Sequence, residues 1–455
     1  MRECWRLLDG RSVTRSRLAW MVWWVGCGPA APEPAPTAPA PAPTAPPPAP
    51  TAPEADEDRL SRLNFIVFDI DSLRADRLEG GPGAPPNLRW LQQRGTLFSR
   101  VYPPAGWTLP SVISMLAGRV APAEALLPEA DPTHHRLLPG ILAAYGYHTG
   151  VAWGDTLLDR HPRRLSWLSG TEPAVDYQTA TGFASALKAG DVPEPFFVML
   201  HDEDLHTALM GRHLAELPPD RAAHLARQQY QQALVDYDVG VGNVLSAMWG
   251  AGLTERTVVV VLSDHGEALY EHGALGHGDL LWEEVARVPM LIVSPTASGA
   301  RRVTRAVSTL DVAPTVLDLA GIGQHAEMRG RSLVSALSGG AAGRDDRAFV
   351  LDSDMNAGAV VVGDLKLLVH PHGCDDAHKQ PFPPLQGAQC VALFDLATDP
   401  LEQHDLSAAR PDDLARLRAA LQTGLQARST PALDEYTEFL SELQQRGYWE
   451  AVDPG

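Results

Sequence analysis

The chain has 455 residues, of which 37 are Lys or Arg and 56 are Asp or Glu, so its formal net charge is −19. This acidic balance argues against a nucleic-acid partner and predicts that an anionic membrane surface repels the folded body. About four hundred residues follow an unusual N-terminal segment, which is enough for one large α/β domain with a smaller subdomain.

The first 58 residues predict export. Arginines precede the apolar stretch 18–26, which is too short to span a bilayer but suits the core of a signal peptide. Cys27 follows directly, as at a bacterial lipoprotein cleavage site, so we expect residues 1–27 to be a signal peptide and Cys27 to be lipidated. A wrongly assigned start or an unprocessed buried segment is the alternative. Residues 28–58 are rich in Ala and Pro and predict an extended tether. The expected location is the bacterial cell envelope, on the periplasmic or outer-membrane face, with the lipid anchor as the only membrane contact.

Two apolar segments end in carboxylates. Residues 64–71 run into Asp71, and residues 258–265 run through valines into Asp264 and His265. Near-continuous apolar runs are typical of buried strands in a parallel sheet, whose ligands gather at the carboxyl ends of the strands. Side chains that converge in this way predict a metal site, whereas a turn or capping role would explain either Asp alone.

Residues 104–119 include Thr108 just before Pro110 and Ser111. Pro and Ser suit the start of a helix, so the hydroxyl of Thr108 is expected near backbone N–H groups and the positive end of a helix dipole, which tolerate an anion. Capping of the helix would explain Thr108 equally well.

Two histidines are candidates for acid–base chemistry. Residues 196–206 predict a buried strand that leads through Asp202 to His206, and His277 lies between two glycines. Imidazoles that titrate near neutral pH can bind an anion or protonate a leaving group, and a structural role is the alternative for each. The two histidines and Asp202 together also form a candidate second metal site or substrate site.

Taken in order, these segments resemble the sulfatase family of the alkaline phosphatase superfamily. The resemblance runs from Leu60 to about Ser407 and includes four further stretches: 86–98, 282–290, 309–321 and 393–402. It implies an alkaline-phosphatase-like α/β fold with a large, mostly parallel sheet between helices and a small antiparallel sheet in a C-terminal subdomain. We expect the catalytic domain at 59–340 and the C-terminal subdomain with its helices at 341–455.

The chain departs from the family at its nucleophile. Thr108 falls where most members carry a Cys or Ser that is oxidised to formylglycine, and Val112 replaces the Arg that the modifying machinery reads. The family's Gly-Lys-Trp-His stretch has its nearest counterpart in residues 152–155, where an acid stands in place of the Lys. The chain is therefore similar to the branches that use Thr, in which a metal ion binds the Thr hydroxyl and lowers its pKa.

The resemblance implies a ligand set and a function. Asp71, Thr108, Asp264 and His265 would hold a divalent ion, and one imidazole among oxygen ligands favours Mn²⁺ or Zn²⁺, with Ca²⁺ as the alternative. The predicted function is hydrolysis of a sulfate or phosphate ester with Thr108 as nucleophile, on an anionic substrate such as an envelope glycan or lipid headgroup. The alternatives are an envelope phosphotransferase, similar to phosphoethanolamine or phosphoglycerol transferases, and a non-catalytic sulfatase-like binding protein.

The C-terminal part predicts a scaffold. Residues 360–369 predict a hairpin with a Gly-Asp turn, and residues 411–427 predict a helix that packs on the resulting sheet. A second amphipathic helix is expected at 433–449. Cys374 and Cys390 bracket a Pro-rich loop and are candidates for a disulfide in an oxidising compartment.

Overall fold

The computed structural model describes residues 62–79, 84–121, 137–153, 168–171, 175–209, 214, 216–278, 280–297, 299–340, 347–352, 357–370 and 390–426. The predicted signal peptide, Cys27, the tether and the helix at 433–449 lie outside the described residues. So do Cys374 and the side chain of Cys390, and the lipidation and the disulfide therefore stay predictions. Within the described ranges, no helix combines the length and the apolar character needed to cross a membrane.

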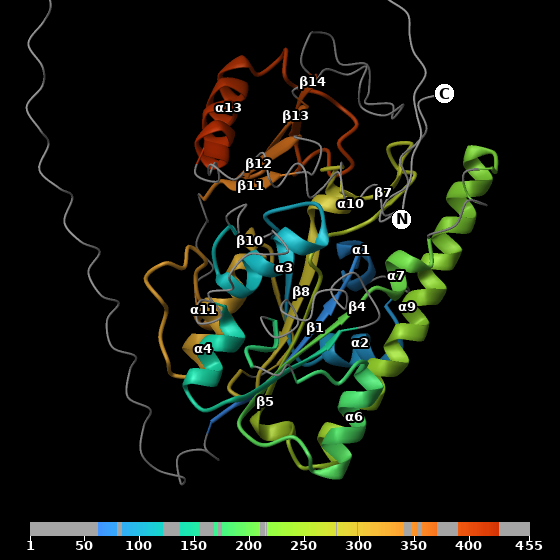
Figure 1. The fold of residues 1–455 in the computed structure, drawn as a ribbon. Helices are drawn as coiled ribbons and strands as arrows, with labels where there is room; N and C mark the ends of the chain where they lie inside the picture. Colours follow the sequence, from blue (N-terminus) through green and yellow to red (C-terminus); the bar gives the residue numbers. More distant parts are fainter. Residues whose placement is uncertain are drawn as a thin grey trace, which may run out of the picture. The chain divides into compact units, whose positions relative to one another are not determined.

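The central sheet confirms the predicted architecture (Figure 1). Its strands are β1 (Asn64–Ile70), β2 (Thr96–Tyr102), β3 (His148–Trp153), β4 (Phe196–Asp202), β5 (Thr257–Leu262), β8 (Val288–Val293), β9 (Arg301–Val303) and β10 (Val307–Ser308). They are ordered β10-β2-β8-β5-β1-β4-β3, with β9 also paired to β2. β8 runs antiparallel to both β2 and β5, and the other pairs are parallel.

The register of β1 explains why two distant segments meet. Every residue of β1 and of β5 is buried, as expected for strands covered on both faces. The strands are parallel, with Phe68 opposite Val261 and Asp69 opposite Leu262. The residues that follow each strand therefore leave the sheet at the same edge.

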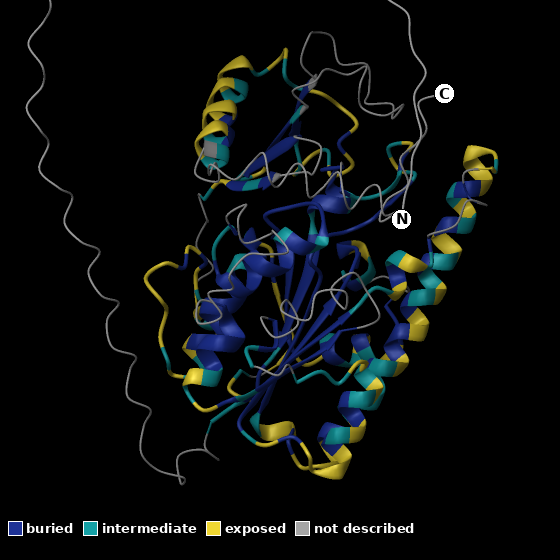
Figure 2. Cartoon of the chain, in the orientation of Figure 1, coloured by how far each residue is buried: buried dark blue, intermediate teal, exposed yellow. Residues whose placement is uncertain are grey.

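Helices cover both faces of the sheet. They are α1 (Ala75–Leu78), α2 (Pro86–Gln92), α3 (Thr108–Ala117), α4 (Leu138–Ala144), α6 (Ala180–Ala189), α7 (Asp204–Thr207), α9 (Pro219–Gly250), α10 (Glu283–Ala286), α11 (Val312–Leu319) and α12 (Val334–Leu337), with 3₁₀ turns η5 (Thr254–Arg256) and η6 (Thr309–Asp311). Phe65 and Val67 of β1 pack in one core with α3, α4 and α11. Ile66 and Phe68 point to the other face and pack with α2, α6 and α9. Figure 2 shows the buried strands of the central sheet, the exposed outer faces of α6 and α9, and a largely buried α3.

A second, four-stranded sheet confirms the predicted C-terminal hairpin. It consists of β11 (Phe349–Asp352), β12 (Gly358–Val362), β13 (Leu365–His370) and β14 (Cys390–Asp395), paired antiparallel in that order. Helix α13 (Pro411–Gln426) packs on one face through Leu417 and Leu421. The other face packs against Trp282 and Val285 at α10, so this subdomain contacts the segment that follows the catalytic candidates. A short hairpin, β6 (Ala268–Leu269) and β7 (Leu275–Gly276), precedes α10.

Candidate active site

The ends of β1 and β5 bring Asp71, Asp264 and His265 together. Their candidate ligand atoms all lie within 4.8 Å of one another, and all three residues are buried. His265 Nε2 lies 3.3 Å from Asp71 Oδ1 and 3.3 Å from Asp264 Oδ2. We call these three residues the acid–histidine cluster.

Local hydrogen bonds fix the direction of these side chains. The Ser263 hydroxyl donates to the Ile70 carbonyl at 2.7 Å and accepts from the Leu73 N–H at 2.9 Å, which ties the end of β5 to the end of β1. His265 Nδ1 lies 2.9 Å from the Gly266 carbonyl oxygen. Because a carbonyl only accepts, Nδ1 carries the hydrogen, and Nε2 faces the carboxylates.

Thr108 points its hydroxyl at this cluster. It is the first residue of α3, and the capping residue before it, Trp107, makes no side-chain cap bond. Thr108 Oγ1 lies 3.1 Å from His265 Nε2, which is 157 residues away in sequence. This hydroxyl therefore contacts a candidate metal ligand.

The acid–histidine cluster fits a divalent cation. The buried Asp264 Oδ2 has no hydrogen-bond partner within the described structure, although buried carboxylate oxygens are normally satisfied. Burial, together with the nearby carboxylates of Asp71 and Asp69, raises the pKa of Asp264 to about 7. Carboxylate, imidazole and hydroxyl ligands suit Mn²⁺ or Zn²⁺. The four residues expected to hold the metal are thus adjacent, and they lack the positive charge that a cation would bring.

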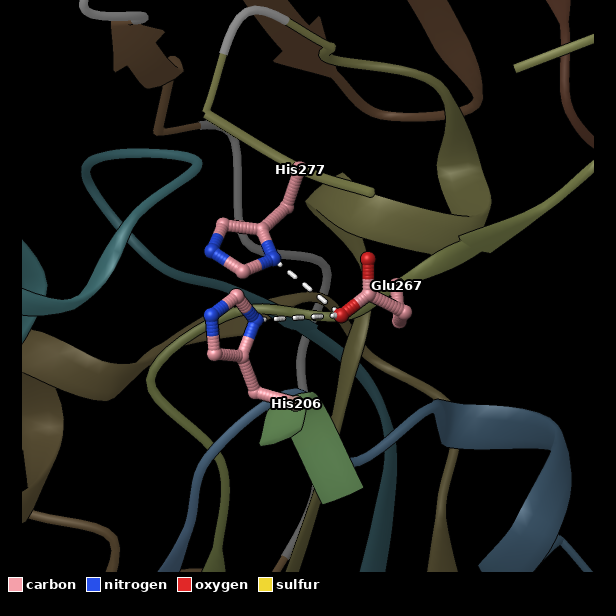
Figure 3. A group of neighbouring side chains, drawn as sticks. All are labelled: His206, Glu267 and His277. Atoms are coloured by element: carbon pink, nitrogen blue, oxygen red, sulfur yellow. Dashed lines mark hydrogen bonds and ion pairs between the residues drawn. The ribbon is translucent and has the colours of Figure 1, made fainter. Parts of the chain in front are cut away.

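A second group consists of His206, Glu267 and His277 (Figure 3). Glu267 Oε2 lies 3.1 Å from His277 Nδ1 and 3.8 Å from His206 Nδ1. Glu267 is buried, and its Oε1 has no hydrogen-bond partner among the described residues. The two rings face the same carboxylate through Nδ1, and their Nε2 atoms point away from it.

The carboxylate in this second group differs from the predicted one. Asp202 was expected beside His206 and His277, but its Oδ1 accepts a hydrogen bond from the Asp204 N–H at 2.9 Å, and it is not among the three clustered residues. Glu267, which the sequence analysis did not assign, takes that place. The sequence could have indicated this role, because Glu267 lies only two residues after His265, at the end of the strand that carries the candidate metal ligands.

The two groups adjoin. The rings of His265 and His277 lie 4.0 Å apart between centroids, and those of His206 and His277 lie 4.8 Å apart. The Gly278 N–H donates to the Gly106 carbonyl at 2.9 Å, which joins the His277 loop to the loop before Thr108. One continuous site therefore contains all the predicted catalytic side chains.

The environment separates the two histidines electrostatically. Burial opposes charge on His206, but the nearby carboxylates of Glu267, 3.8 Å away, and Asp71 raise its pKa to about 9. Burial and the nearby His265 lower the pKa of His277. Burial alone would raise the pKa of Glu267, but the rings of His277 and His206 lower it, so Glu267 is ionised.

His201 and Asp69 form a buried pair next to Asp71. His201 Nδ1 lies 3.0 Å from Asp69 Oδ2, and the His201 ring stacks on Trp153 with centroids 3.9 Å apart. Burial disfavours the imidazolium, but Asp69 raises the pKa of His201 to about 10. The pair therefore holds its own charge balance beside the acid–histidine cluster.

The fold and the site together define an α/β protein with an alkaline-phosphatase-like sheet and a buried acid–histidine centre at the carboxyl edge of that sheet. The family model for Sulfatase matches residues 64–322, more than half of the chain. This chain therefore belongs to the sulfatase family.

Relatives and solved structures agree with this assignment. Arylsulfatase K of Danio rerio is 27% identical over 181 residues, which cover 39% of this chain and 34% of that protein. A sulfatase of Formosa agariphila is 31% identical over 102 residues, 22% of this chain and 20% of that protein. The match thus spans about a third or less of the length of these relatives. The superposition on the structure of a 2-O GAG sulfatase covers 81% of this chain and 92% of that chain, with 18% sequence identity and a TM-score of 0.62. The two proteins therefore share the fold.

Proposed function

We propose that this chain is a metal-dependent hydrolase of sulfate or phosphate esters with Thr108 as its nucleophile. The observation that carries the proposal is the 3.1 Å contact between Thr108 Oγ1 and His265 Nε2, beside the buried carboxylates of Asp71 and Asp264. A hydroxyl directed at a set of metal ligands is the arrangement that activates an otherwise weak nucleophile.

Asp71, Thr108, Asp264 and His265 are the residues that would hold the ion, with Mn²⁺ or Zn²⁺ favoured over Ca²⁺ because an imidazole is among the ligands. When bound, a divalent cation supplies Lewis-acid charge that stabilises the oxygens of the ester and of its nucleophile. The chain itself orients these ligands through Ser263 and through the Gly266 carbonyl.

The histidines move the protons. Thr108 Oγ1 forms a bond to sulfur or phosphorus while the bond from that atom to the alcohol oxygen breaks. In this proposal the Thr108 proton passes to Nε2 of His277, whose ring lies 4.0 Å from the ring of His265 that Thr108 contacts. The departing alcohol takes a proton from Nε2 of His206, whose ring lies 4.8 Å from that of His277. Water then displaces Thr108 as the histidines exchange roles, which releases the anion. The raised pKa of His206 and the lowered pKa of His277 support this division, because paired groups with diverging pKa values divide acid and base work.

The proposed substrate is an anionic ester of a glycan or of a lipid headgroup. Two similar folds support a glycan: one was solved with D-glucosamine-2-N,6-O-disulfate and another with a neocarrahexaose. If the chain is cleaved before Cys27 and Cys27 is lipidated as predicted, the substrate would be a component of the cell envelope.

The test is nitrophenol release by the full chain. Nitrophenyl sulfate, phosphate and phosphodiester are each supplied with Mn²⁺, Zn²⁺ or Ca²⁺. We expect one ester to turn over only with metal, Thr108→Ala to lose at least about 10³-fold in kcat, and Thr108→Ser to retain activity because it keeps the hydroxyl. Thr423→Ala, on the exposed side of α13, is the matched control. Undiminished turnover by Thr108→Ala would refute the nucleophile assignment.

A further inference from the structure

A buried ion triad joins the C-terminal subdomain to the catalytic domain. Lys366 of β13 is fully buried, and its Nζ lies 2.9 Å from Glu402 Oε1 and 3.1 Å from Glu283 Oε1. Glu402 Oε2 also accepts a hydrogen bond from the backbone N–H of Glu283 at 2.6 Å. We call Lys366, Glu283 and Glu402 the lysine triad.

Glu402 adopts a backbone conformation that side chains rarely take. Its φ is +54°, in the left-handed region, which costs a non-glycine residue roughly 1 kcal/mol or more. Such strain persists only where surrounding contacts fix the residue. Here Glu402 Oε1 forms the ion pair with Lys366, and Oε2 accepts the hydrogen bond from the Glu283 N–H. The geometry therefore holds this carboxylate against the start of α10.

Helix α10 in turn holds the loop that carries the metal ligands. The N–H groups of Gly266 and Glu267 donate to the carbonyls of Val285 and Glu284 at 2.8 and 2.9 Å. The loop and the helix touch backbone to backbone, since a Cβ on Gly266 would lie 2.1 Å from the Glu284 oxygen. Asp264 and His265 directly precede this contact.

We propose that Glu402, supported by Lys366, is a positioning residue for Asp264 and His265 and acts through α10. The helix has only four residues, so a shift of the N–H that Glu402 binds also moves the carbonyls that hold Gly266 and Glu267. Both residues of the triad that come from the C-terminal subdomain lie outside the family match of 64–322. The inference rests on the proposed function, because it assigns a task to the proposed metal ligands.

Two double variants separate this contact from the charge around it. Lys366→Met with Glu402→Gln and Lys366→Met with Glu402→Leu both remove the ammonium and the Glu402 charge. Only Gln keeps an oxygen that can accept from the Glu283 N–H. Glu283 retains Arg287 in both variants, at 3.2 Å. A difference between them therefore reports the single hydrogen bond.

Two measurements are made on the full chain: hydrogen exchange of the Gly266 and Glu267 amides without metal, and Mn²⁺ affinity. We expect the Leu variant to lose amide protection at these two residues and about 10-fold or more in Mn²⁺ affinity, which is typical for loss of an outer partner of a metal site. The Gln variant should keep the protection and an affinity within about 3-fold of the unmodified chain. Equal amide protection in the two double variants would overturn the proposal.

A control and a second route keep the test decisive. Arg100→Ala breaks an ion pair of 2.6 Å to Asp364, which joins the same subdomain to β2, and it should leave both readouts unchanged. If Arg100→Ala lost amide protection and Mn²⁺ affinity as the Leu variant does, any weakening of the subdomain contact would explain both losses, and the proposal would fail. If the Leu variant does not fold, Glu283→Pro is compared with Glu283→Ala: both remove the carboxylate, and only Pro removes the N–H donor, at the first helical position where Pro is tolerated. Only Glu283→Pro should then lose amide protection. If the unmodified chain does not bind Mn²⁺, the proposed Mn²⁺ site fails, while amide exchange still decides the positioning role.

Discussion

Two buried clusters of ionisable groups differ in how their charge is balanced. In the acid–histidine cluster, the ion pairs of both carboxylates run to a single imidazole. In the lysine triad, an ammonium lies between two carboxylates, which raise its pKa against the effect of burial. Burial of carboxylates is costly unless a positive charge accompanies them. The acid–histidine cluster is therefore expected to bind a cation from solution, whereas the lysine triad contains its own cation. This difference distinguishes a ligand-binding site from a structural ion cluster.

The largest expected effect is the loss of the internal cation. Lys366→Met should lower the free energy of unfolding by about 3–5 kcal/mol, because it leaves Glu283 and Glu402 buried without their ammonium. Urea unfolding of the metal-free chain measures this. The companion change Glu402→Gln should recover part of the loss. A decrease below about 1 kcal/mol would place the lysine triad among ion pairs of little consequence.

The acid–histidine cluster should respond in the opposite sense. Asp264→Asn should weaken Mn²⁺ binding by at least about 100-fold, or about 2.7 kcal/mol, because it removes one charged ligand. The metal-free chain should not become less stable, because burial already disfavours the charged form of Asp264, whose pKa is raised to about 7, and the amide carries no charge. Calorimetric titration and urea unfolding measure the two quantities. Unchanged Mn²⁺ affinity would remove Asp264 from the ligand set.

The His201–Asp69 pair is a second cluster that contains its own positive charge, and the pH dependence of stability tests this. The folded pKa of His201, about 10, is raised above the ordinary value of 6.5. Its stabilising effect is therefore complete below pH 6.5 and is lost as pH rises from 6.5 to about 10, with a slope of at most about 1.4 kcal/mol per pH unit. The double variant Asp69→Asn with His201→Gln keeps a hydrogen-bonding pair without charge. Its unfolding free energy, followed in urea across this range, should lack that slope; an identical slope would assign the pH dependence to other groups.

The smallest expected effect belongs to an exposed ion pair. Arg100→Ala removes the ion pair to Asp364 and a hydrogen bond to the Gly363 carbonyl at the same subdomain boundary as the lysine triad. It should cost about 1 kcal/mol or less, because Asp364 is exposed and Arg100 is partly exposed. Thermal unfolding is a sufficient measurement. A cost as large as that of Lys366→Met would show that burial does not distinguish the two pairs.

The sequence carries most of the fold because its strongest patterns are local. The apolar runs before Asp71 and Asp264 are long enough to predict buried parallel strands, and the register of β1 and β5 then brings the carboxylates to one edge. The C-terminal hairpin at 360–369 was likewise predictable from two short apolar runs on either side of a Gly-Asp turn.

The remaining parts depend on directions that spacing does not give. Capping and nucleophile roles for Thr108 both require a helix start, and only the contact with His265 distinguishes them. Asp202 and Glu267 are both acids near strand ends, but the loop after β5 is folded back on α10 and turns Glu267 toward the two histidines. The lysine triad joins residues from three separate segments, and no local pattern connects them.

The direction of β8 has a consequence for how this protein can vary. Because β8 runs antiparallel to β5, the chain leaves the sheet after Leu262 and returns at the same edge, at Val288. The turn between β6 and β7 lies within this excursion, with Tyr270 and Gly273 at positive φ. We expect a change of length at this turn to leave the register of the central sheet unchanged, although it would alter the contacts of Glu271 with Arg74 and of His272 with Glu284. The length of this turn is therefore a feature that can differ between homologous chains that share the same central sheet.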